Sequence, residues 1–104
     1  MARISRHVHN FSGRTQVSRR HRHSFSGQTF VNTMPMSNGR HRHRYNVRTS
    51  RDFDHRHRLI NITGPNINIG RGRHIHRASG VSTRDFAHTH RYRFTTGRNI
   101  RYQG

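Results

Sequence analysis

A repeated pair of histidines restricts the possible folds of this sequence more than any other feature does. All twelve histidines fall into six His-x-His triplets, which begin at His7, His21, His41, His55, His74 and His88. Successive triplets start 14, 20, 14, 19 and 14 residues apart, so short and long intervals alternate. The repeating unit is therefore a pair of triplets, 33–34 residues long, and the chain contains three units at about 6–39, 40–72 and 73–104. Because a disordered tail has no reason to keep this register, we predict one folded repeat domain over residues 1–104.

Each triplet opens a phrase of nine residues in which a spacing of two continues. The clearest copies, at 7–15 and 21–29, read His-x-His-x-aromatic-x-Gly-x-Thr. Looser copies occupy residues 41–49, 55–63, 74–82 and 88–96. Strict alternation is typical of a β-strand with two unlike faces, whereas a helix would scatter the histidines. Each phrase therefore predicts one long strand, with histidine, aromatic and threonine side chains on its inner face.

The links between the phrases predict turns and shorter strands. Links of about five residues within a unit suit hairpin loops. The longer links contain turn signals such as Gly64-Pro65, followed or preceded by a short alternating segment. Equivalent segments of this kind lie at 34–36, 67–69 and 100–102. We predict an all-β fold: a compact sandwich or barrel of about six long antiparallel strands plus short strands, built from three internal repeats of about 33 residues. A pseudo-threefold prism and a β-solenoid remain open.

The composition excludes several classes of protein. Cysteine is absent, which rules out disulfides, thiolate zinc sites and a cysteine nucleophile. The only acidic residues are Asp52, Asp54 and Asp85, so few carboxylates are present for catalysis by a carboxylate pair. We therefore predict that the protein is not an enzyme. No apolar run is long enough for a membrane span, and the N-terminus has no hydrophobic signal core. We expect a cytoplasmic, nucleoid or spore-associated protein, with an extracellular filament as the alternative.

The histidine pairs admit two interpretations. Side chains at i and i+2 of a strand project from one face, so a pair can supply two ligands to zinc, copper or nickel. Alternatively, the imidazoles form a hydrogen-bonded layer that replaces missing hydrocarbon, since only 27% of the residues are hydrophobic. We favour the structural role because the pattern recurs in every phrase and the net charge of +18 opposes another cation. The candidate metal ligands are His7, His9, His21, His23, His41, His43, His55, His57, His74, His76, His88 and His90.

All 21 basic residues are arginines, and many of them occupy the outward positions of the predicted strands. Guanidinium groups bind phosphate in a bidentate manner and keep their charge, so a face with one sign of charge indicates a polyanionic partner. The predicted polyanion-binding residues are Arg14, Arg22, Arg42, Arg44, Arg48, Arg56, Arg58, Arg77, Arg91 and Arg93. No base-reading motif is visible, so we expect non-specific contacts with the phosphate backbone, most simply of duplex DNA.

The histidine phrases and the Thr-Gly-Pro-Asn-Ile-Asn-Ile-Gly-x-Gly-x-His-x-His stretch at 63–76 resemble the YmaF family, small histidine-rich proteins of spore-forming bacteria. The resemblance covers roughly residues 6–100 and implies a compact β-rich repeat, but no catalytic residues and no settled biochemical role. In the family pattern the position after His-x-His is often acidic. Here that position holds Asn10, Ser24, Arg44, Arg58, Arg77 and Arg91, which indicates an outer face recharged for an anionic partner.

Three functions follow as hypotheses. The first is a non-enzymatic protein that binds nucleic acid, DNA in preference, through its phosphates and packs as a multimeric coat or filament. The second is a self-assembling structural protein of a filament, a spore or a cell surface, and the third is a metal-binding protein that uses the histidine pairs. In each case a small core favours homo-oligomers or bound partners that add stability.

Overall fold

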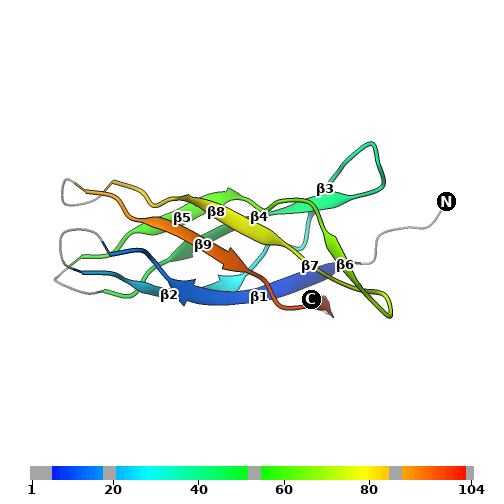
Figure 1. The fold of residues 1–104 in the computed structure, drawn as a ribbon, viewed down its shortest axis with the longest axis horizontal. Helices are drawn as coiled ribbons and strands as arrows, with labels where there is room; N and C mark the ends of the chain where they lie inside the picture. Colours follow the sequence, from blue (N-terminus) through cyan, green and yellow to red (C-terminus); the bar gives the residue numbers. More distant parts are fainter. Residues whose placement is uncertain (1–5, 18–20, 52–54, 85–87, 103–104) are drawn as a thin grey trace.

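The computed structural model describes residues 6–17, 21–51, 55–84 and 88–102, which form an elongated molecule (Figure 1). Its principal extents are 49 × 26 × 20 Å. Every regular element within the described ranges is a strand, and none is a helix long and apolar enough to cross a membrane. The prediction of an all-β chain is confirmed.

Three antiparallel hairpins form the body of the molecule. Their strands are β1 (His7–Arg14) with β2 (Ser24–Gln28), β4 (His41–Arg48) with β5 (Arg58–Ile62), and β8 (Arg77–Val81) with β9 (Arg91–Thr95). The strands lie within the predicted phrases, and burial alternates along them as the spacing of two requires, except at Val8 of β1, which is buried between two buried histidines. His21, His55 and His88, each of which precedes the second strand of its hairpin, lie together at one end of the molecule.

The second strand of each hairpin is shorter than its phrase, because the main-chain hydrogen bonds between the two strands stop being regular at the histidines. Thr15 N–H donates to the His23 carbonyl oxygen (2.8 Å), but His23 N–H donates to the Thr15 side-chain oxygen (3.0 Å). Thr49 and His57 exchange hydrogen bonds in the same way. A side-chain oxygen therefore replaces one main-chain acceptor, and the regular ladder stops before it reaches the first histidine of the phrase.

Short strands join each hairpin to the next. They are β3 (Thr33–Pro35), β6 (Ile67–Gly70) and β10 (Asn99–Arg101), at the places where the sequence predicts one short strand per unit. β3 pairs with β4, β6 pairs with β7 (Arg73–Ile75), and β10 pairs with β1. The last described strand is thus bonded to the first, so the two ends of the described chain lie side by side.

The strands make four separate antiparallel sheets and not a closed barrel, so the barrel alternative is wrong. The sheet orders are β10-β1-β2, β3-β4-β5, β6-β7 and β8-β9. Between the hairpins, isolated main-chain hydrogen bonds replace continuous ladders, as between Phe30 N and Arg44 O (2.8 Å) or Thr83 N and Arg58 O (2.9 Å). The threonine bonds described above interrupt the ladders at the places where the neighbouring hairpins meet.

A small aromatic core lies between the ends of the hairpins. It contains Phe11, Phe25, Tyr45, Leu59, Ala78, Tyr92 and Phe94. Phe11 and Phe94 stack with ring centroids 4.4 Å apart, and the buried hydroxyls of Tyr45 and Tyr92 hydrogen-bond at 2.7 Å. Phe30, in contrast, is 48% exposed because it follows the last inward residue of its phrase.

Candidate metal centres

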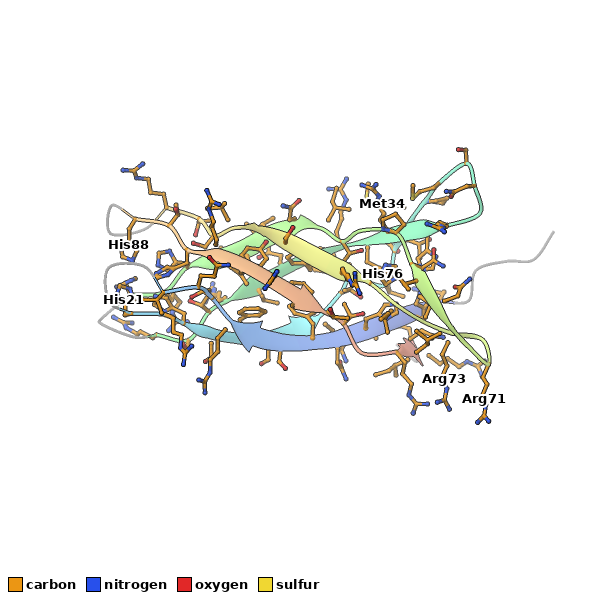
Figure 2. The ribbon with its side chains drawn as sticks, viewed as in Figure 1. His21, Met34, Arg71, Arg73, His76 and His88 are labelled. Carbon is orange, nitrogen blue, oxygen red and sulfur yellow. The ribbon has the colours of Figure 1, made fainter. Side chains whose placement is uncertain are left out.

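The twelve histidines gather into two clusters. The first histidine cluster contains the opening triplet of each unit: His7, His9, His41, His43, His74 and His76. The second histidine cluster contains the other triplets: His21, His23, His55, His57, His88 and His90. Because β1 and β2 run antiparallel, the two triplets of a hairpin lie at its opposite ends, with the core aromatics between them. Figure 2 shows His21 and His88 together at one end and His76 well away from them.

Threonines of the same hairpin hold the backbone of the second histidine in each triplet. In the first cluster the histidine N–H groups donate to threonine Oγ1 atoms at 3.0–3.1 Å, in the pairs His9–Thr29, His43–Thr63 and His76–Thr96. In the second cluster the acceptors are hydroxyls at 2.9–3.0 Å, in the pairs His23–Thr15, His57–Thr49 and His90–Ser82. The threonine or serine that closes each phrase therefore positions a histidine of the paired phrase.

The side chains of the same six histidines are oriented by carbonyl groups of neighbouring hairpins. The Nδ1–H groups donate at 2.8–3.0 Å in the pairs His9–Gly97, His43–Phe30, His76–Gly64, His23–Ser50, His57–Thr83 and His90–Gln16. A carbonyl oxygen can only accept, so Nδ1 carries the proton in each neutral ring. The lone pair is then on Nε2, which points into the cluster. This outer hydrogen bond is the arrangement that orients metal-binding histidines in proteins.

The Nε2 atoms of the first cluster converge on one point. Those of His7, His41 and His74 form a triangle with sides of 3.2, 3.1 and 3.0 Å. The Nε2 atoms of His9 and His43 lie 3.1 Å from members of this triangle, and the six ligating atoms of the cluster all lie within 4.8 Å of one another. Six ring nitrogen atoms therefore face one small volume, and for His9, His43 and His76 the Nδ1–H bonds place the lone pair on the Nε2 atom that faces it.

The second cluster has a similar geometry at the other end of the hairpins, where the ligating atoms of His21, His23, His55, His88 and His90 all lie within 4.8 Å of one another. The Nε2 atoms of His21, His55 and His88 form a triangle with sides of 3.1, 3.1 and 3.2 Å. The rings of His23, His57 and His90 pack against one another with centroids 4.8–4.9 Å apart. In both clusters, therefore, the first histidines of three triplets form one layer, and the second histidines of the same triplets form a layer next to it.

Burial lowers the pKa of five of the clustered imidazoles far enough to favour their neutral form at neutral pH. Desolvation, assisted by the neighbouring histidines, lowers the pKa of His9 and of His74 from 6.5 to about 3. The same causes lower the pKa of His41 to about 3 and the pKa of His43 and of His90 to about 4. Neutral imidazole is the form that binds metal, so at neutral pH no proton competes for these lone pairs.

A purely hydrogen-bonded histidine layer leaves buried acceptors unsatisfied. His76 and His90 are at most 1% exposed, and within the described residues their Nε2 atoms have no hydrogen-bond partner. An unsatisfied buried acceptor costs about 1–3 kcal/mol. A single cation at the centre of each cluster would satisfy such lone pairs, so these residues fit a metal as well as the structural layer that we favoured from the sequence.

The arginines lie on the opposite face of the strands. The predicted polyanion-binding residues are all exposed: Arg14, Arg22, Arg42, Arg44, Arg48, Arg56, Arg58, Arg77, Arg91 and Arg93. Three of them, Arg42, Arg77 and Arg93, line one groove of about 710 Å³. The three aspartates lie outside the described residues, so the described surface carries no carboxylate side chain.

Sequence reasoning found every histidine but not their grouping. The alternating intervals of 14 and 19–20 residues contain that signal, because they place first triplets together and second triplets together once the three units associate. The main-chain carbonyls that accept hydrogen bonds from the histidine Nδ1–H groups could not be predicted from the sequence, because no particular side chain marks them. They are contributed by the residue after each closing threonine or serine, which differs from phrase to phrase.

A family model matches most of the chain. The model of the YmaF family, described as spore germination protein GerY/YamF, matches residues 4–97. The chain belongs to the YmaF family. No curated protein and no solved structure matches it. The match covers all six triplets, so both histidine clusters lie inside the YmaF region.

Proposed function

We propose that this protein is a non-enzymatic metal-binding protein with two centres, one in each histidine cluster. The observation that carries the proposal is the convergence of Nε2 atoms at 3.0–3.2 Å while the Nδ1–H groups are held by backbone carbonyls. Transition-metal ions that accept imidazole nitrogen are the class that fits, and zinc, copper and nickel remain in it beside iron and cobalt.

The proposal also explains how a chain with so little hydrocarbon folds. The first cluster takes its histidines from β1, from β4 and from the β7–β8 region. The second cluster takes its histidines from the segments that precede β2, β5 and β9. An ion bound there ties three hairpins together at both ends of the core. Because a site of this kind does not exist in the unfolded chain, its binding free energy adds to the stability of the fold.

Elemental analysis of the purified protein tests this function. The protein is unfolded in a chelator, refolded with one divalent ion at a time, and dialysed before the metal content is measured. We expect two ions per chain and a melting temperature that a strong chelator lowers. Protein that stays metal-free, with a melting temperature indifferent to chelator, would contradict the proposal.

We further propose that the three units share one pseudo-threefold arrangement. Its support is the recurrence of the same histidine–threonine hydrogen bond in each hairpin and the pairing of β10 with β1. The sandwich alternative and assembly into a coat or filament stay predictions.

Polyanion binding is a second candidate, and it is independent of the metal centres. The groove lined by Arg42, Arg77 and Arg93 supports it, since the described residues place no acidic group near these cations. Guanidinium groups around a groove suit a phosphate backbone, with duplex DNA as the first choice.

Duplex DNA binding measured across a range of salt concentrations tests this candidate. Several phosphate contacts predict a log–log slope of about −0.9 per contact. Changing Arg42, Arg77 and Arg93 to glutamate should reduce the slope and the affinity more than the same charge change at Arg71, Arg73 and Arg98. A salt-independent affinity, or equal effects of both variants, would rule out the groove as the site.

A further inference from the structure

The arrangement of rings within each cluster defines a coordination geometry. In the first cluster each ring contacts four of the other five, which places three pairs across the centre from each other: His7 and His76, His9 and His41, and His43 and His74. All other pairs are side by side, with centroids 4.5–5.3 Å apart and planes inclined by 65–89°. One opposite partner for every member, with all others adjacent, is the arrangement of the corners of an octahedron.

The second cluster has the same arrangement. Its opposite pairs are His21 and His57, His23 and His88, and His55 and His90. The remaining pairs are side by side at 4.8–5.1 Å. Two clusters built from different residues thus share one pattern of ring contacts, although the ligating atoms that lie within 4.8 Å of one another in the second cluster are those of His21, His23, His55, His88 and His90 and do not include that of His57.

The distances between ligating atoms agree with an octahedron. Five pairs of neighbouring Nε2 atoms in the first cluster lie 3.0–3.2 Å apart, and all six ligating atoms lie within 4.8 Å of one another. An octahedron with such edges has its centre about 2.2 Å from each corner, close to the metal–nitrogen distance of about 2.0–2.1 Å that is typical of zinc. A tetrahedral site needs four ligands, which would leave two of the buried lone pairs unused.

We propose that each cluster binds one divalent transition-metal ion through all six imidazole Nε2 atoms, as an octahedral and coordinatively saturated centre. This inference rests on the proposed metal-binding function and specifies its chemistry. The six ligands are neutral, so a divalent ion keeps its full charge at the centre. Ions that readily adopt six-coordination, such as Fe²⁺, Co²⁺ and Ni²⁺, are the expected occupants.

Saturation has a functional consequence. A catalytic metal keeps one position open for water or substrate. With six protein ligands no such position remains, so neither centre would activate a bound water or take a substrate as an additional ligand. The centres are therefore suited to holding the fold together or to retaining the ion.

The visible spectrum of the cobalt-loaded protein tests the geometry. The full chain is refolded with Co²⁺, and cobalt is quantified before the spectrum is recorded. Octahedral Co²⁺ gives a weak pink d–d absorption, because its transitions are forbidden by symmetry, whereas tetrahedral Co²⁺ gives an intense blue band. We expect two cobalt ions per chain with the weak spectrum only. Bound cobalt with an intense blue band would overturn the octahedral inference and leave metal binding intact, whereas failure to take up cobalt, nickel or zinc would overturn both.

Saturation is tested separately with thiocyanate, which binds to open positions on cobalt. Thiocyanate should leave the spectrum of the unaltered protein unchanged. His41→Ala removes one ligand of the first cluster, so thiocyanate should shift the signal of about half of the bound cobalt. Asn46→Ala, an exposed change on the same strand β4, is the matched control and should behave as the unaltered protein. A thiocyanate response in the unaltered protein would show an open position and contradict saturation.

Discussion

At the scale of single residues, the two nitrogens of one imidazole have different tasks. His43 shows this most clearly: its Nδ1–H donates to Phe30 O at 2.8 Å, while its Nε2 lies 3.1 Å from His7 Nε2. The first contact fixes the tautomer, and the second places the lone pair in the cluster. A histidine used only for packing has no need of this division.

Removal of one ligand should affect one centre and spare the other. His9→Ala takes a fully buried imidazole from the first cluster and leaves the second cluster unchanged. We expect retained metal to fall from two ions per chain to about one after dialysis against a weak chelator, because chelation by fewer ligands is weaker. Ser12→Ala, an exposed change on the same strand, should retain both ions. Two tightly held ions in the His9 variant would contradict the assignment.

The depressed histidine pKa values set the acid limit of the fold. In the unfolded chain these groups titrate near 6.5, whereas in the folded chain the pKa of His9 and of His74 is about 3. Between these values the unfolded chain binds more protons, so acid favours unfolding. The free energy of unfolding of chelator-treated protein should be constant above about pH 7, fall as the pH drops through 6.5, and keep falling toward 3. Denaturant titrations at several pH values measure it, and equal stability at neutral and mildly acidic pH would show that these imidazoles are not held neutral.

At the scale of elements, the closing threonine of each phrase links two strands. Thr63 Oγ1 accepts a hydrogen bond from His43 N–H at 3.1 Å and donates one to Gly64 O at 3.0 Å. Alternation in the sequence correctly predicted strands and an inward threonine. It did not predict where the ladders would break, because that depends on a threonine and a histidine meeting across a hairpin.

Replacement of this threonine by valine keeps its shape and removes its hydroxyl. Thr63→Val should lower the free energy of unfolding by about 1–3 kcal/mol, because the buried His43 N–H loses its acceptor. Thr95→Val, at an exposed position of β9, should change stability by less than about 0.5 kcal/mol. Chemical denaturation of both variants measures the difference. Equal stabilities would mean that the hydroxyl contributes little to holding the histidine.

At the scale of the whole molecule, two dications would lie inside a protein with a net charge of +18. The hollow beside His7 is lined by Arg6 and Arg101, so the surface near the first cluster is cationic as well. The sequence revealed this charge and the periodicity of the units. The closing of β10 onto β1, and with it the gathering of distant triplets, depends on long-range contacts that no local pattern encodes.

Salt should therefore strengthen metal binding. Screening at a Debye length of about 10 Å or less weakens the repulsion between the arginines and the incoming ion. We expect the apparent Kd for Ni²⁺ to fall several-fold between about 0.05 M and about 0.5 M of a weakly coordinating salt. Competition titrations with an indicator measure it, with sucrose of matched osmolarity as the control. Weaker binding at high salt would indicate that negatively charged ligands take part.

The central claim is that each histidine cluster surrounds one metal ion. A crystal structure of metal-loaded protein, with an anomalous difference map recorded at the absorption edge of the metal, tests it most directly. We predict two peaks per chain, one within reach of all six Nε2 atoms of each cluster. Peaks elsewhere on the surface, or none at all in protein that has been given metal, would contradict it.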